Sequence, residues 1–278
     1  MTKQNDIISY DNLSISKINI KKNNNIIPQI KIIKNNFGIK IYENDFKYIG
    51  TLENKIPKGI GILYDKKGNF YKGEFINKLN GYGEYKNEKG INIGYFINNI
   101  QNGIGYEKWK DGTLYKGNFL NGKKNGIGSY FWNDGTIYEG EWENNTINGF
   151  GIYKFRDGRI YYGQWKNNLM NGYGEFFWVD GKKYFGYYNN DKKNGFGIYF
   201  WPKDKFYIGF WENGFQNGIG KSIKGNIIKY GIWKNGKKNI CFNNKNEFEL
   251  YNEPRKEEFK KFFNMNIMEI KNFFGIDD

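Results

Sequence analysis

Residues 138–158 read YEGEWENNTINGFGIYKFRDG, and this stretch decides the fold because the chain repeats it. YKGNF at 115, YYGQW at 161, YFGYY at 184 and YIGFW at 207 stand in register with YEGEW at 138, at steps of 23 residues. More divergent copies begin at Tyr48, Tyr71, Asn92 and Lys229. A period of this length predicts a repeat protein in which each unit packs against its neighbours.

Each repeat has the pattern of a β-hairpin. In YEGEW, period-2 alternation places Tyr138, Gly140 and Trp142 on one face of a strand and the glutamates on the other. Asn-Gly recurs at 80–81, 102–103, 125–126, 148–149, 171–172, 194–195 and 217–218, and Asp-Gly at 111–112, 134–135, 157–158 and 180–181. Because these residues tolerate positive φ, both pairs predict tight turns, so each repeat should be two short antiparallel strands.

The glycines of the GxG motifs leave room for a neighbouring ring to lie flat on the backbone. A phosphate-binding GxG requires a helix after it, whereas here another strand and turn follow, so a nucleotide loop is strongly disfavoured. The central residue is never charged, which predicts a structural spine. Its members are Ile60, Tyr82, Ile104, Ile127, Phe150, Tyr173, Phe196 and Ile219.

The chain of 278 residues contains no histidine and one cysteine, Cys241. The usual general base, the Ser-His and Cys-His pairs and the commonest metal ligand are therefore missing. We expect no catalytic residues, no metal and no cofactor, and hence no enzyme. No apolar run is long enough to span a bilayer and the first ten residues lack a signal-peptide core, so we expect a cytoplasmic protein.

The YxGxW, NGxG and DG pattern at 23-residue spacing resembles the MORN repeat (membrane occupation and recognition nexus). The resemblance covers residues 48 to about 240, with departures at Asn92, which replaces the leading tyrosine, and Asp204, which replaces a turn glycine. It implies an all-β fold, an elongated single-layer antiparallel sheet of tandem β-hairpins. Eight to nine repeats at 48–240 would follow a β-rich cap with a degenerate half repeat at 1–47.

Residues 241–278 differ in character and predict a short amphipathic helical cap or tail. Pro254 suits a first helical turn. Phe259, Phe262, Phe263, Ile267, Ile270 and Phe274 follow at helical spacing. A capping helix is favoured over a detachable, partner-binding helix.

The resemblance also implies a non-catalytic scaffold, as in cytoskeletal, ciliary and cortical assemblies, which binds a helical or extended segment of a partner through an aromatic groove or its ends. A one-layer sheet cannot hide both faces, so two aromatic rows should stay partly in water and form this groove. The alternative is that the rings are fully packed on the glycines of adjacent strands. The rows comprise Tyr115, Phe119, Tyr138, Trp142, Tyr161, Trp165, Tyr184, Tyr188, Tyr207 and Trp211.

The net charge of +14 allows another function. Lysine pairs stand at one offset in three repeats and predict a basic edge that could dock on anionic phospholipid at the cytosolic face of a membrane. Lysines in turns are more often merely solvated, and nucleic acid is disfavoured because these lysines are not interleaved with a stacking platform. A homodimer is compatible with the pattern. The pairs are Lys123 and Lys124, Lys192 and Lys193, and Lys237 and Lys238.

Overall fold

The computed structural model describes residues 30–34, 36–251, 255, 265 and 267–273. The part of the predicted N-terminal cap that precedes residue 30 therefore lies outside the described residues. The chain divides into two compact units, residues 1–147 and residues 148–278, and each is considered by itself.

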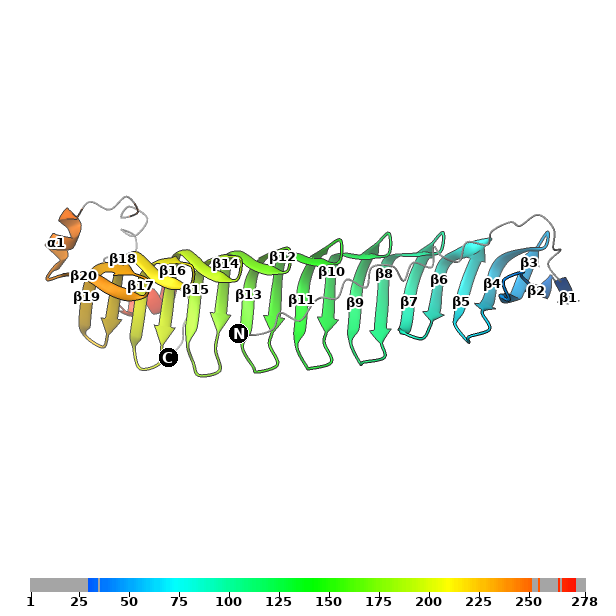
Figure 1. The fold of residues 1–278 in the computed structure, drawn as a ribbon, viewed down its shortest axis with the longest axis horizontal. Coiled ribbons are helices and arrows are strands. Elements are labelled where there is room, and N and C mark those ends of the chain that lie inside the picture. Colours follow the sequence, from blue (N-terminus) through cyan, green and yellow to red (C-terminus); the bar gives the residue numbers. More distant parts are fainter. Residues whose placement is uncertain (1–29, 35, 252–254, 256–264, 266, 274–278) are drawn as a thin grey trace. The chain divides into compact units, whose positions relative to one another are not determined.

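The first unit is a single antiparallel layer in which each strand pairs with the next along the chain (Figure 1). Its strands are β1 (Ile30–Lys34), β2 (Phe37–Ile41), β3 (Lys47–Glu53), β4 (Ile56–Tyr64), β5 (Phe70–Ile76), β6 (Lys78–Lys86), β7 (Gly90–Ile97), β8 (Ile100–Trp109), β9 (Leu114–Leu120), β10 (Lys123–Phe131) and β11 (Ile137–Glu143).

The second unit begins within β12 (Thr146–Lys154) and continues the same up-and-down order. It contains β13 (Ile160–Lys166), β14 (Leu169–Phe177), β15 (Lys183–Asn189), β16 (Lys192–Trp201), β17 (Lys205–Glu212), β18 (Phe215–Lys224), β19 (Ile227–Lys234), β20 (Lys237–Phe242), α1 (Lys245–Leu250) and α3 (Ile267–Phe273). The all-β fold of single-layer antiparallel hairpins with a short C-terminal helix is confirmed.

The predicted Asp-Gly turns are confirmed, whereas the Asn-Gly prediction is wrong. In the turn after β10, the Asp134 Oδ1 accepts a hydrogen bond from the Thr136 N–H at 2.8 Å, and Gly135 has φ of 90°. The Asn-Gly at 125–126 instead lies inside β10. The tight turn before it is Asn121-Gly122, with φ of 50° and 75°.

The leading tyrosines fix the inner geometry of the hairpins that carry them. In β9 and β10, Gly117 pairs with Gly128, and the ring of Tyr115 lies across both. A Cβ atom on Gly117 would stand 2.5 Å from the Tyr115 Oη and 2.5 Å from the Gly128 Cα. Neither glycine can therefore carry a side chain without moving the ring or the backbone.

A register shift beside each tyrosine explains why the ring carries a hydroxyl. After the Gly117–Gly128 pair, the next pair is Phe119–Lys124, so Asn118 lies inside the shift. The Tyr115 Oη donates a hydrogen bond to the Asn118 carbonyl oxygen at 3.0 Å. The Asn-Gly pairs thus lie in β-bulges, which accommodate the extra residues of the second strand.

This hydrogen bond recurs through both units. The donors are Tyr48, Tyr71, Tyr115, Tyr138, Tyr161, Tyr184 and Tyr207, and each acceptor is the backbone carbonyl three residues later. Burial raises the pKa of these hydroxyls, to about 12 for Tyr48. We call the face of each unit that carries these rings the tyrosine face, and the opposite one the GxG face.

The C-terminal segment covers part of the GxG face of the second unit. In α1, Phe248 packs against Tyr230 and Phe242, with ring centroids 5.3 Å and 5.5 Å apart. In α3, Ile270 is fully buried in the same cluster. Its strand members are Phe185, Ile198, Phe200, Phe206, Ile208, Phe210, Ile219, Ile223 and Phe242.

The helices differ in extent from the one predicted around residues 253–275. The first, α1, begins after Asn244, whose side chain accepts a hydrogen bond from the Glu247 N–H, and it ends before Pro254. The second, α3, begins at Ile267. The predicted helical residues Phe259, Phe262, Phe263 and Phe274 lie outside the described residues.

A matched pair of tyrosines tests the role of the hydroxyl. The Tyr184 Oη donates to the Tyr187 carbonyl at 3.1 Å, whereas the buried Tyr188 Oη has no hydrogen-bond partner among the described residues. We expect Tyr184→Phe to lower the free energy of unfolding by about 1 kcal/mol, and Tyr188→Phe to leave it unchanged or raise it by a similar amount. Urea unfolding measures both. Equal losses in the two variants would contradict this account.

Candidate binding surface

The ten aromatic residues predicted to form a groove are all buried, with exposed fractions from 0% to 7%. The expectation that these rings lie partly in water is therefore wrong, and packing on adjacent strands is what the structure shows. Trp142 illustrates the reason, since its ring meets Tyr115 and Tyr138 edge-on at 5.5 Å and 5.4 Å. Neighbouring repeats thus fill the space that a single sheet would leave open. Recognition of a partner by these rings remains a prediction.

Two of the six predicted lipid-binding lysines also lie on the tyrosine face. The Nζ of Lys193 lies between 4.7 and 5.2 Å from the centroids of four rings, those of Trp178, Tyr184, Tyr199 and Trp211. The ring faces attract the ammonium, while burial lowers the pKa of Lys193 to about 8. This lysine is part of the packed aromatic layer and is not a surface charge.

Lys124 has the corresponding position in the first unit. Its Nζ lies over the rings of Trp109, Tyr115 and Tyr130, and it pairs with Glu107 at 3.4 Å. Of the six lysines, Lys123, Lys192, Lys237 and Lys238 are exposed. The predicted edge of lysine pairs therefore has four exposed lysines and not six.

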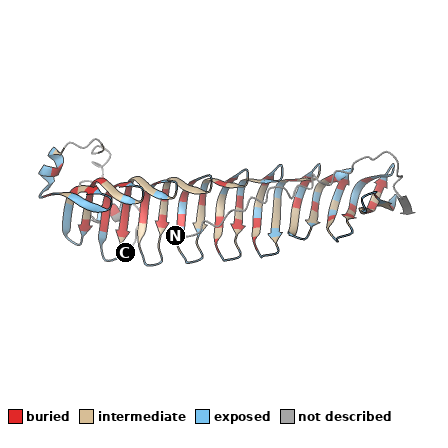
Figure 2. Ribbon diagram, viewed as in Figure 1, coloured by how far each residue is buried: buried red, intermediate tan, exposed pale blue. Residues whose placement is uncertain are grey.

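The predicted spine of GxG central residues is largely exposed, which corrects the sequence interpretation. In the first unit Ile60 is 63% exposed, Tyr82 52%, Ile104 71% and Ile127 62%. These residues point away from the tyrosines, because alternation sends the glycines toward the rings and the residue between them to the other side. In Figure 2, exposed and buried residues accordingly follow one another along the strands.

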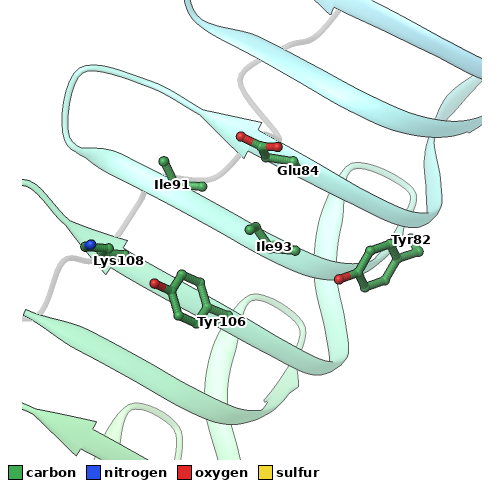
Figure 3. Close-up of a pocket in the computed structure, with 6 residues that line it drawn as sticks. All are labelled: Tyr82, Glu84, Ile91, Ile93, Tyr106 and Lys108. Atoms are coloured by element: carbon green, nitrogen blue, oxygen red, sulfur yellow. The ribbon is translucent and has the colours of Figure 1, made fainter.

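An open groove of about 470 Å³ lies on the GxG face across β6, β7 and β8 (Figure 3). Its lining is Tyr82, Glu84, Ile91, Ile93, Tyr106 and Lys108. Beside it, Tyr95 of β7 is 52% exposed and meets Tyr82 edge-on, with ring centroids 5.5 Å apart. Sequence reasoning missed this site because it assigned recognition to the opposite face.

In the part of the chain that the structure describes, no cluster of three or more acidic or cysteine side chains could hold a metal ion. Within the same residues, neither helix has the length or the apolar character to cross a membrane. The groove offers apolar area, two phenol hydroxyls, a carboxylate and an ammonium.

The Lys193 environment gives a pH-dependent prediction. Because the folded pKa is about 8 and the unfolded pKa is near its ordinary 10.5, the unfolded state binds more protons between these values. The wild-type protein should therefore gain stability relative to Lys193→Met as pH rises from 7 to 9.5, by about 2 kcal/mol. Urea unfolding at several pH values measures this difference. The control is Lys192→Met, which changes an exposed lysine, and its free energy of unfolding should follow the same pH dependence as that of the wild type. If the free energy of unfolding of Lys193→Met also followed the wild-type pH dependence, the buried ammonium would be refuted.

Comparison with solved structures gives distant likenesses. The TCP10 domain of Danio rerio CPAP in complex with a peptide of Danio rerio STIL is 11% identical, with a TM-score of 0.49 over 79% of this chain and 99% of that one. The TCP domain of Drosophila melanogaster SAS-4 with a proline-rich motif of Ana2 is 11% identical, with a TM-score of 0.31 over 66% of this chain and 90% of that one. Both TM-scores lie below 0.5, so neither structure indicates a function for this chain.

The comparison with curated protein sequences finds no match. The family model of the MORN repeat, in contrast, matches residues 71–90, 93–114, 115–137, 138–158, 161–183, 184–204 and 207–226. These seven consecutive matches cover more than half of the sequence, and six of them begin at a leading tyrosine. The chain therefore belongs to the MORN-repeat family.

Proposed function

We propose that this protein is a non-catalytic scaffold that binds partner proteins through the GxG face of its repeats. The observation that supports this most directly is the row of isoleucines and one tyrosine at the GxG centres of the first unit, each of which is more than half exposed. At two strands per repeat, successive members stand about 10 Å apart. Exposed apolar area arranged in a regular row is typical of protein interaction sites.

The alternative site, on the tyrosine face, has less free area. Its rings lie against one another and against glycine backbone, and Lys124 and Lys193 fill further space above them. A partner could reach only their edges without opening the layer. The GxG face requires no such rearrangement, so we place the interface there.

The setting follows from the family resemblance. A cytoplasmic scaffold of a cytoskeletal, ciliary or cortical assembly, or one at the cytosolic face of a membrane, accords with a sequence without histidine and with one cysteine. The partner on this proposal is a protein segment, helical or extended. A homodimer would use the same face.

A capture experiment with the full chain tests the interface. We expect the double variant Ile104→Glu and Ile127→Glu to lose most captured proteins in proximity labelling from the native cell, because charged side chains cannot be buried in an apolar contact without large cost. Both positions are more than 60% exposed, so the fold should tolerate the change. Quantitative mass spectrometry measures the loss.

The matched control for that experiment is Val179→Glu. Val179 is 70% exposed and lies in the turn after β14, away from the GxG centres. Its captured proteins should equal those of the wild type. Equal capture by the double variant would place the interface elsewhere, and no specific capture by any form would refute the scaffold.

Lipid binding is a separate prediction, which the exposed lysines test. If the basic edge docks on membranes, Lys123→Glu with Lys192→Glu should reduce co-sedimentation with phosphatidylserine vesicles at least several-fold, and salt should weaken wild-type binding. Ile104→Glu with Ile127→Glu serves as the control and should leave it unchanged. Binding that ignores both the lysine changes and salt would show that these lysines are only solvated.

A further inference from the structure

A site in β7 and a site in β17 have a similar arrangement on the GxG faces of their units, and among the described residues only the β17 site is covered. In β17 the residues on this face are Phe206, Ile208 and Phe210, and in β7 they are Ile91, Ile93 and Tyr95. Two other strands interrupt these positions with polar residues, Lys116 with Asn118 in β9 and Glu139 with Glu141 in β11, whereas β19 also has apolar or aromatic residues there. We call the residues of β6, β7 and β8 around Ile93 the β7 patch.

The two sites match pair by pair across their strands. Tyr82 pairs with Tyr95 in the first unit as Phe196 pairs with Phe210 in the second. Both are edge-on aromatic pairs, with centroid separations of 5.5 Å and 5.7 Å and interplanar angles of 72° and 71°. The similarity therefore extends from sequence to side-chain geometry.

The covered site shows what such a surface binds. Ile208 and Phe210 are 0% and 2% exposed within the cluster that contains Ile270 of α3. The Arg255 guanidinium lies 4.5 Å from the centroid of the Phe210 ring and occupies the space over Gly218. Among the described residues, the β17 site is thus covered by a buried isoleucine of a short helix and by a stacked arginine.

The β7 patch keeps the corresponding space free of other described residues. Gly103 is the counterpart of Gly218, and above it the nearest atom to an added Cβ is the Tyr95 Cβ at 3.9 Å. Tyr95 remains 52% exposed where its counterpart Phe210 is buried. The patch also carries a carboxylate, Glu84, in place of the buried Ile198.

We propose that the β7 patch is the docking site for an amphipathic helix of a partner protein, with isoleucine or phenylalanine on its apolar face and an arginine that stacks on Tyr95. Glu84 favours that arginine through charge complementarity, and Tyr82, Ile91 and Ile93 contact the apolar face of the helix. This inference rests on the proposed scaffold function and names the chemistry of its ligand. The occupant at β17 is a segment of this chain, so a peptide of that segment is a suitable probe.

The probe is a fluorescein-labelled synthetic peptide of residues 255–273, titrated with the full-length protein and followed by anisotropy. We expect saturable binding to the wild type, at least ten-fold weaker binding to Tyr95→Glu and to Glu84→Arg, and unchanged binding to Val179→Glu. Tyr95 and Val179 are both more than half exposed, and Val179 lies away from the GxG centres, which makes the control a matched one. A peptide with Arg255→Ala should also bind at least several-fold more weakly.

The variants separate this proposal from its alternatives. Circular dichroism and the melting temperature establish that each variant is folded, and Glu84→Arg provides the test if Tyr95→Glu is not. Absence of peptide binding would overturn the helix proposal. Equal binding to all variants would also overturn it, because the peptide would then be replacing the chain's own C-terminal segment at the β17 site. In either case, loss of proximity labelling in the double variant Ile104→Glu and Ile127→Glu would still support the scaffold function. A concentration-dependent dimer of wild-type protein that Tyr95→Glu abolishes would identify a second copy as the source of the helix.

Discussion

The stacking of one tyrosine on two facing glycines is the interaction on which every repeat with a leading tyrosine depends. In β13 and β14, Gly163 pairs with Gly174, and the ring of Tyr161 lies over both while its hydroxyl reaches the Gln164 carbonyl at 2.9 Å. Ring, hydroxyl and bulge are mutually dependent, because the bulge supplies the carbonyl and the glycines supply the space. A phenylalanine would keep the packing and lose the hydrogen bond.

This arrangement gives the two faces of the sheet different roles. On the tyrosine face the rings of successive repeats meet edge-on and leave almost no area exposed, as with Tyr184 and Trp211 at 5.4 Å. The GxG centres are turned away from this layer and cannot be buried by it. Their burial requires a second element, which the C-terminal segment supplies around β17, whereas Ile104 in the first unit is 71% exposed.

Residues that depart from the repeat consensus mark the places where a side chain does something other than pack on neighbouring repeats. Lys193 replaces the apolar residue that Ile147 and Met170 provide at the same place in their repeats, and it contacts four rings. Tyr95 and Ile93 depart in the other direction, since they put apolar groups where β5, β9 and β11 have charged or polar residues. The first departure adds a cation to a closed layer, and the second leaves an apolar surface that a partner can cover.

The sequence alone determined the repeat, its alternation, the all-β class and the Asp-Gly turns, because each depends on residues close together in the chain. Tyr138 and Trp142 share a buried face as their spacing predicts. Only the tertiary structure decided which face is filled, since the burial of Tyr138 depends on rings from neighbouring repeats. The same holds for the GxG centres, where Ile219 is buried under the C-terminal segment and Ile127 is exposed despite identical local sequence patterns. Burial there depends on contacts between residues far apart in the chain, and no local pattern encodes them.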